Sequence, residues 1–249
     1  MGRSGASRVV SPARAPRYTA GMPARPCFTP ALFRFLEELR LHNDREWFER
    51  HRERYLRDVR DPMLRFIAGF APVLRRMAPR LVADPRPVGG SLFRIHRDTR
   101  FSADKTPYKT NVAAQFRHEA GRDVHGPAFY LSLDPDEVVV GGGVWHPEQE
   151  ALLRLRRSIA EKPGPWRRAT GTPAMRALEW WGESLKRTPR GFAEGLPLEA
   201  MIRRKDFAAG LVLSRRDALS PRFPARVAGV YRALLPTMKL MAQAVGVPW

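Results

Sequence analysis

The stretch GPAFYLSLDPDEVVVGGGVWHP, residues 126–147, decides the fold class. Residues 129–133 place Phe129, Leu131 and Leu133 on one side of an extended chain, because successive side chains of a strand point to opposite faces. The turn-forming residues 134–136 then lead directly into the apolar run 137–140. Such a short connection admits only antiparallel pairing, so we predict a β-hairpin within an antiparallel sheet.

The triple glycine that follows, residues 141–143, resembles a phosphate-binding loop only superficially. A phosphate-binding loop continues with lysine and a serine or threonine, whereas this chain continues with Val144 and Trp145. Glycines inside a strand more often mark a bulge or a close approach of backbone in the sheet. We therefore predict a structural role for them.

Other strands and the helices follow from hydrophobic periodicity. Residues 91–98 and 110–116 alternate as strands do. Helical spacing, often preceded by a cap and a proline, predicts the remaining elements. We expect helices from Thr29-Pro30 to His42-Asn43, from Asn43 or Asp44 onward, from Asp61-Pro62 with a disturbance at Pro72, from Pro147 to Ile159, around residues 166–169 and 173–181, and from Ser220-Pro221 to a stop before Pro236.

Helices on both sides of a run of strands indicate an α+β fold, with a central antiparallel sheet of about four to five strands packed against N-terminal and C-terminal helices. We predict one domain over residues 28–249, because no long polar linker interrupts it. Residues 1–27 hold five arginines and no acidic residue, and we predict that they are disordered. Residues 1–21 are best explained as an inert tail or a gene-model extension before Met22, while a targeting peptide and a polyanion-binding arm stay open.

The composition excludes several classes of protein. A single cysteine, Cys27, excludes an internal disulfide framework and a four-cysteine zinc site. No run approaches the roughly 18 apolar residues of a membrane span, so we expect a soluble, cytoplasmic protein. The net charge of +19 attracts polyanions, although the preference for arginine over lysine also fits a GC-rich genome. Alternating Arg/Glu runs in the first helices indicate solvated helix faces.

The strongest candidate site is residues 93–110, FRIHRDTRFSADKTPYKT. Cations, carboxylates and aromatic residues are interleaved between two predicted strands, where guanidinium groups are well placed to meet phosphate or carboxylate. A structural alternative carries equal weight: the two aspartates pair locally with the cations and tie the loop down. The candidate ligand-binding residues are Arg94, Arg97, Asp98, Arg100, Asp104, Lys105, Tyr108, Lys109 and Trp145.

The run FRIHRDTRFSADKTPYKTNVAAQF, with GPAFYLSLDPDEVVVGGGVWHP, LKRTPRGF and IRRKDF, resembles the DUF2461 family of uncharacterised proteins. The resemblance spans residues 28–245 and implies the same fold and the importance of the candidate residues and the triple glycine. It implies no reaction. One departure is that residues 192–199 lack the acidic-His-Pro element that relatives tend to show.

We expect an Arg-rich cleft that binds a phosphorylated or otherwise anionic small molecule, with Trp145 as one wall and Asp98 orienting an arginine or acting as a base. If the protein is an enzyme, a hydrolase or transferase acting on a phosphate ester fits best. No catalytic residue is assigned, no cofactor is identified, and we expect no metal site, because His118, His125, His146 and Asp123 lack metal-ligand spacing. The alternatives are a nucleic-acid-binding module that uses a distributed basic surface and a structural motif that contacts another protein.

Overall fold

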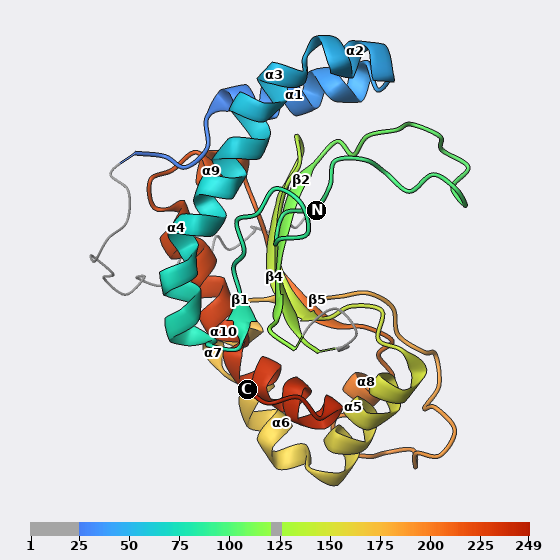
Figure 1. Ribbon diagram of the computed structural model, residues 1–249. Coiled ribbons are helices and arrows are strands. Elements are labelled where there is room, and N and C mark those ends of the chain that lie inside the picture. Colours follow the sequence, from blue (N-terminus) through green and yellow to red (C-terminus); the bar gives the residue numbers. More distant parts are fainter. Residues whose placement is uncertain (1–24, 121–125) are drawn as a thin grey trace, which may run out of the picture.

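The computed structural model describes residues 25–120 and 126–249 (Figure 1). Its centre is a six-stranded antiparallel sheet in the order β1-β2-β3-β4-β6-β5. The predicted α+β class is confirmed, with more strands than the four to five expected. The strands are β1 (Leu81–Val82), β2 (Val112–His118), β3 (Ala128–Leu133), β4 (Val138–Val144), β5 (Glu179–Trp181) and β6 (Phe207–Leu213).

The predicted hairpin is confirmed as β3 and β4. Leu133 lies opposite Val138, and the Asp134 N–H donates to the Glu137 carbonyl at 2.9 Å. Strand β4 extends past the predicted residues through all three glycines to Val144. The middle of the sheet is therefore formed by residues that are close together in the chain.

One face of the sheet carries the main core. Phe116, Phe129 and Leu131 are fully buried there, since they occupy alternate positions that the register aligns across β2 and β3. Tyr231 stacks on Phe129 with ring centroids 4.1 Å apart, and its hydroxyl donates to the Tyr130 carbonyl at 3.1 Å. Helices α4 (Asp61–Met77) and α10 (Phe223–Val245) lie side by side over this face (Figure 1).

A second apolar cluster lies where α5, α6 and α8 meet the other end of the sheet (Figure 1). Trp166 is its largest fully buried side chain, and the indole N–H donates to the Ser158 hydroxyl at 3.1 Å. The helices are α1 (Pro30–Leu41), α2 (Arg45–Arg50), α3 (Arg52–Tyr55), the π-helical turn η1 (Leu56–Arg60), α4 (Asp61–Met77), α5 (Gln149–Glu161), α6 (Pro163–Thr170), α7 (Pro173–Arg176), α8 (Glu199–Ile202), α9 (Arg215–Ala218) and α10 (Phe223–Val245).

Two prolines do not act as predicted. Helix α4 continues through Pro72 and α10 continues through Pro236, although an internal proline removes a backbone hydrogen bond. Beyond Pro236, Met238 and Met241 are still buried. Packing of the amphipathic face therefore outweighs the local defect, because most helix stability in proteins comes from such packing.

Two other predictions need correction. Residues 173–181, expected to be helical, contain only the short α7 followed by β5, because Trp180 and Trp181 pair with β6. Residues 91–98 form isolated bridges at Leu92 and His96 and no continuous strand. Among the described residues, no helix combines the length and apolarity needed to cross a membrane.

The glycines of β4 and β6 let the Trp181 indole lie against the sheet, which was not predicted, and the predicted close approach of backbone occurs at Gly143. A Cβ at Gly141 would fall 2.4 Å from the Trp181 ring. At Gly143, where φ is +142°, a Cβ would fall 2.0 Å from the Phe207 carbonyl oxygen. These separations leave no room for a side chain.

Replacing Gly210 by alanine tests this packing. A Cβ there would lie 2.2 Å from the Val140 carbonyl oxygen and 2.3 Å from the Trp181 ring. Overpacking of this kind costs about 1–3 kcal/mol, so Gly210→Ala should lower the free energy of unfolding in urea by that amount. The matched control is Gly229→Ala, where nothing lies within 4 Å and stability should be unchanged or raised by up to about 1 kcal/mol. Equal free energies of unfolding for the two variants would contradict the close packing around Gly210.

Candidate functional site

The candidate segment forms an irregular two-stranded ribbon, which we call the ribbon (residues 91–115). Its two sides are joined by backbone hydrogen bonds from Phe93 to Ala113 at 2.9 Å, from Arg97 to Pro107 at 2.9 Å and from Lys109 to Ile95 at 2.8 Å. The ribbon continues from the start of β2 and projects away from the sheet (Figure 1). The tip of the ribbon therefore lies away from the main core, whereas Leu92, Tyr108 and Ala114 at its base belong to that core.

Charges at the ribbon tip, residues 98–106, pair with one another. Asp98 accepts two hydrogen bonds from the Arg100 guanidinium, at 3.0 and 2.7 Å. The Lys105 ammonium donates to the Thr99 carbonyl at 2.9 Å. Phe101, at 97 % exposure, stands beside the Arg100 guanidinium, which lies 5.8 Å from its ring centroid. The tip thus follows the structural alternative, in which aspartates and cations tie the loop together.

The base of the ribbon is held by one asparagine at the junction of α1 and α2. The Asn43 amide donates to the Tyr108 carbonyl at 2.9 Å, and the Tyr108 N–H donates to the Asn43 side-chain oxygen at 3.0 Å. The Tyr108 ring is buried and stacks on Phe48, with centroids 4.1 Å apart. These contacts fix the backbone of the ribbon against the helices.

A polar hollow of about 410 Å³ opens between the end of α1 and the base of the ribbon. We call it the Lys109 hollow. Both cations and hydrogen-bonding side chains surround it, which suits a charged ligand of small-molecule size. It is lined by Arg40, Asn43, Arg97, Asp104, Thr106, Tyr108, Lys109, Thr110 and Asn111.

Both arginines in this hollow already have carboxylate partners. Arg40 binds two carboxylates of the β3–β4 turn, Asp134 at 2.9 Å and Asp136 at 2.8 Å. Arg97 donates to Asp104 and to the Thr106 hydroxyl. The Arg97 guanidinium, with the Thr106 N–H and hydroxyl, holds the pKa of the Asp104 carboxyl down at about 2.

Lys109 differs from these arginines. Its ammonium lies 5.1 Å from the centroid of the Phe93 ring, and it makes no ion pair within the part of the chain that the structure describes. Partial burial lowers the pKa of Lys109, and the nearby charge of Arg94 lowers it further. A half-buried cation without a counterion is a favourable place for an anion.

The structure brings together four of the nine predicted ligand-binding residues. Arg97, Asp104, Tyr108 and Lys109 line the Lys109 hollow. Arg94, Asp98, Arg100 and Lys105 belong to the same ribbon but lie outside that lining. Asp98 contacts Arg100, so its geometry fits the expected orienting role.

The prediction that Trp145 forms a wall of this cleft is wrong. Val112, Leu133 and Val138 are aligned at the ribbon end of the sheet, whereas Val144 pairs with Phe207 at the opposite end. Trp145 follows Val144 directly and therefore lies at the far end of β4 from the ribbon. The ribbon and Trp145 are therefore separated by the whole length of β4.

Trp145 belongs to a different cluster. It is 53 % exposed and contacts His146, whose ring nitrogen Nδ1 lies 3.2 Å from the buried Asp206 carboxylate. That carboxylate accepts backbone N–H groups from His146 at 2.9 Å and from Glu183 at 3.1 Å. It holds His146 in a left-handed backbone conformation, φ +47°, which indicates a tight structural turn.

The side chains considered for a metal site are His118, His125, His146 and Asp123. No group of three or more His, Cys, Asp or Glu side chains suitable for a metal occurs among the described residues. Of the four candidates, His118 is buried and bonds through Nε2 to the Pro248 carbonyl at 2.7 Å. His125 and Asp123 lie outside the described residues.

The predicted ligand-binding set lacks five of the lining residues: Arg40, Asn43, Thr106, Thr110 and Asn111. Arg40 lies in a charged helical run that indicates a solvated face, and Asn43 is in a helix-capping context. Asn111 donates to the Ser132 hydroxyl at 2.7 Å, a contact that only the β2–β3 pairing creates. Local patterns therefore identified the ribbon, but not Arg40 and Asn43, which face it from the end of α1 and the α1–α2 junction.

Comparison with known proteins gives one family. A family model described as "Conserved hypothetical protein (DUF2461)" matches residues 31–240. No curated protein matches the chain.

The contact between Asn43 and Tyr108 should be measurable by hydrogen exchange. Asn43→Ala removes two hydrogen bonds, each worth about 0.5–1.5 kcal/mol, so the Tyr108 amide should exchange roughly tenfold faster or more. Asn111→Ala is the matched control, because it removes a bond to Ser132 and leaves the Asn43 contact intact. Unchanged exchange in Asn43→Ala would contradict the proposed anchoring.

Titration of the aspartates tests the ion pairs of the ribbon. The pKa values of Asp98 and Asp104, lowered to about 2 by Arg100 and Arg97 respectively, are below the unfolded value of 3.8. The stabilisation is therefore present above pH 3.8 and is lost as pH falls toward 2. NMR of the carboxyl carbons should show Arg97→Gln returning the Asp104 pKa toward 3.8, while Arg100→Gln moves that of Asp98. Any other pairing of variant and shift would refute these contacts.

Proposed function

Because the chain belongs to the DUF2461 family of conserved hypothetical proteins, whose description states no reaction, we propose a function from the site itself: the protein binds a small phosphate-containing anion in the Lys109 hollow. One observation carries this proposal. The Lys109 ammonium borders the hollow, and no carboxylate of the described chain pairs with it.

An anion at Lys109 would relieve an electrostatic cost. Removing an ammonium from water disfavours its charged form, and the lowered pKa of Lys109 reflects that burial together with repulsion from Arg94. A phosphate oxygen beside Nζ would supply the missing counter-charge. A charge-assisted hydrogen bond of this type contributes about 1.5–3 kcal/mol.

The rest of the lining supports a polar ligand. Asn111 and Thr110 add amide and hydroxyl groups to the hollow. Burial raises the pKa of Tyr108, so its phenol stays protonated at neutral pH. Arg40 and Arg97, each fixed by carboxylates, contribute rigid guanidinium groups whose remaining N–H bonds can donate.

We assign binding alone, without acid–base chemistry. Asp98 and Asp104 have pKa values held at about 2 by their arginine partners. A carboxylate that is so weakly basic is a poor general base at neutral pH, since an efficient catalytic pKa lies near the working pH. Both aspartates are better suited to orienting arginines.

A small ligand fits these observations better than a nucleic acid does. The net charge of +19 would favour a polyanion, but the cations at the ribbon tip are occupied by local partners. A cavity of about 410 Å³ is of the size that small molecules use. A distributed surface would instead need many cations that face the solvent together.

The test is calorimetric titration of the full chain with inorganic phosphate, sugar phosphates and nucleotides. Lys109→Met should weaken binding by roughly 10- to 100-fold, the equivalent of one charge-assisted bond. Lys105→Met is the matched control: it removes the same charge from the same ribbon, outside the hollow, and should change affinity less than about threefold.

Two outcomes would overturn the proposal: none of these probes binds, or the two lysine variants weaken binding equally. Binding of single-stranded oligonucleotides that falls steeply with salt and ignores Lys109→Met would instead support the nucleic-acid alternative.

A further inference from the structure

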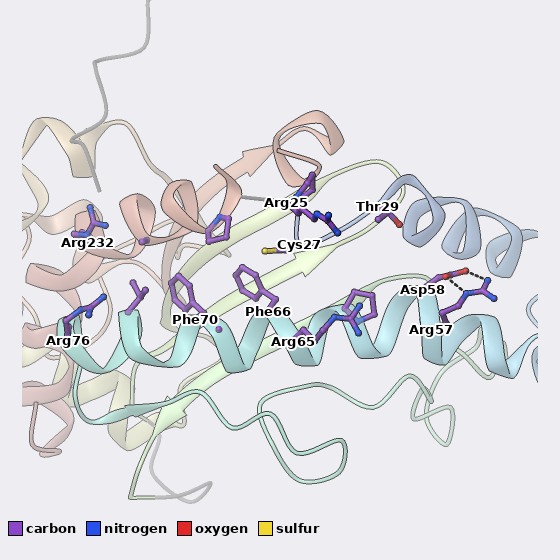
Figure 2. A pocket seen from close by; sticks show the side chains of 16 residues that line it. Arg25, Cys27, Thr29, Arg57, Asp58, Arg65, Phe66, Phe70, Arg76 and Arg232 are labelled. Carbon is purple, nitrogen blue, oxygen red and sulfur yellow. Dashed lines mark hydrogen bonds and ion pairs between the residues drawn. The ribbon is translucent and has the colours of Figure 1, made fainter. Parts of the chain in front are cut away.

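A second, larger cavity lies away from the ribbon, between α4, α10 and residues 25–29 (Figure 2). We call it the α4–α10 groove. Its volume is about 770 Å³, within the range of small-molecule sites. The floor is apolar and includes Phe66, Phe70, Val73 and Ala228.

The groove exists because its walls carry small residues. Gly69 lies in the middle of α4, and a Cβ placed on it would meet nothing within 4 Å. Across the groove stands Ala228 of α10. Glycine is unfavourable inside a helix, and no neighbouring atom would clash with a side chain at Gly69. The effect of Gly69 on the structure is therefore the open space that it leaves in the groove.

The rim is strongly basic. Arg25, Arg65, Arg76 and Arg232 border the groove. The acidic residue among those lining it is Asp58, which already pairs with Arg57 at 2.8 Å. Arg65 and Arg76 form no ion pair within the described residues. An apolar floor beneath a basic rim is complementary to a molecule with an apolar body and an anionic head.

The two ends of the groove differ in charge. Arg76 and Arg232 stand at one end, and the Arg57–Asp58 pair stands at the other (Figure 2). Because the Arg57–Asp58 pair is neutral overall, an anionic head would be attracted more strongly to the end that carries Arg76 and Arg232. Arg65 and Arg76 are separated by about 16 Å along the helix axis, at about 1.5 Å per residue, so the channel suits an extended chain.

We propose that the α4–α10 groove binds a long-chain fatty carboxylate, with its alkyl chain along Phe66 and Phe70 and its carboxylate at Arg76 and Arg232. Burial of the chain supplies the hydrophobic contribution, and the planar guanidinium forks match the geometry of a carboxylate. This site is separate from the Lys109 hollow and does not depend on the function proposed there.

The N-terminal segment of the chain is a poor occupant by charge. Residues 1–24 contain Arg3, Arg8, Arg14 and Arg17 and no Asp or Glu. A segment of that composition would be repelled by the arginine rim. A bare inorganic anion, in turn, would leave the apolar floor unused.

The first experiment titrates the full chain with three probes: dodecanoate, dodecanol and acetate. Dodecanoate should bind, dodecanol should bind roughly tenfold more weakly or worse because it lacks the charge, and acetate should not bind measurably. Equal affinity for dodecanoate and dodecanol would overturn the role of the rim, and binding of acetate as tight as that of dodecanoate would overturn the role of the floor.

Variants with matched controls locate the site. Gly69→Leu fills the groove at a helical position with open space, so it should abolish dodecanoate binding without lowering the melting temperature. Gly229→Leu makes the same change on α10, where nothing lies within 4 Å, outside the groove lining, and should bind normally. Arg76→Gln should weaken binding roughly tenfold, whereas Arg75→Gln, its neighbour outside the lining, should not. Unaltered binding in Gly69→Leu would overturn the proposal.

The single cysteine provides a direct reporter. Cys27 and Phe66 both line the groove (Figure 2), and the chain has one cysteine in all. Dodecanoate should slow modification of Cys27 by a thiol reagent in the wild type and in Gly229→Leu, but not in Gly69→Leu. If dodecanoate binds while Cys27 reacts at an unchanged rate, the ligand lies elsewhere and the proposal is wrong.

Discussion

The antiparallel register of β3 and β4 is the constraint on which the rest of the structure depends. Because Leu133 lies opposite Val138, the large apolar side chains of both strands face α4 and α10. The same turn carries Asp134 and Asp136, which bind Arg40 and thereby attach the end of α1 to this end of the sheet. The ribbon leaves β2 at that end, so the Lys109 hollow forms where helix, turn and ribbon meet.

The fold was largely predictable, because its deciding signals are local. Alternation around residues 129–140 and the proline-led helix start at Pro30 depend on nearest neighbours, and both agree with the structure. Strand β6 was missed because FAAGLVL contains small residues without clear alternation, and β5 depends on pairing with it.

For the site, the ribbon residues were recognisable by composition, whereas Arg40 and Asn43 come from a distant helix junction. The prediction that Trp145 lies near the ribbon was wrong because the order of the two motifs in the sequence does not show at which end of the sheet each one lies.

Local ion pairs hold part of the positive charge of this protein. Arg54 binds Glu38, Arg100 binds Asp98 and Lys205 binds Glu183, so these cations are already engaged, and the net charge of +19 counts the excess over the carboxylates. Exposed pairs of this kind contribute little to stability. Two sets of cations matter for the candidate sites: Lys109, beside an aromatic ring, and the arginines that border the apolar floor between α4 and α10.

Gly69 has a consequence for how this surface changes between related proteins. One base substitution converts a glycine codon to alanine or valine, and neither side chain would meet another atom at the Cβ position. The depth of the groove can therefore drift in small heritable steps while the fold stays intact. At Gly210, where backbone and the Trp181 indole surround the Cβ position, no comparable variation fits.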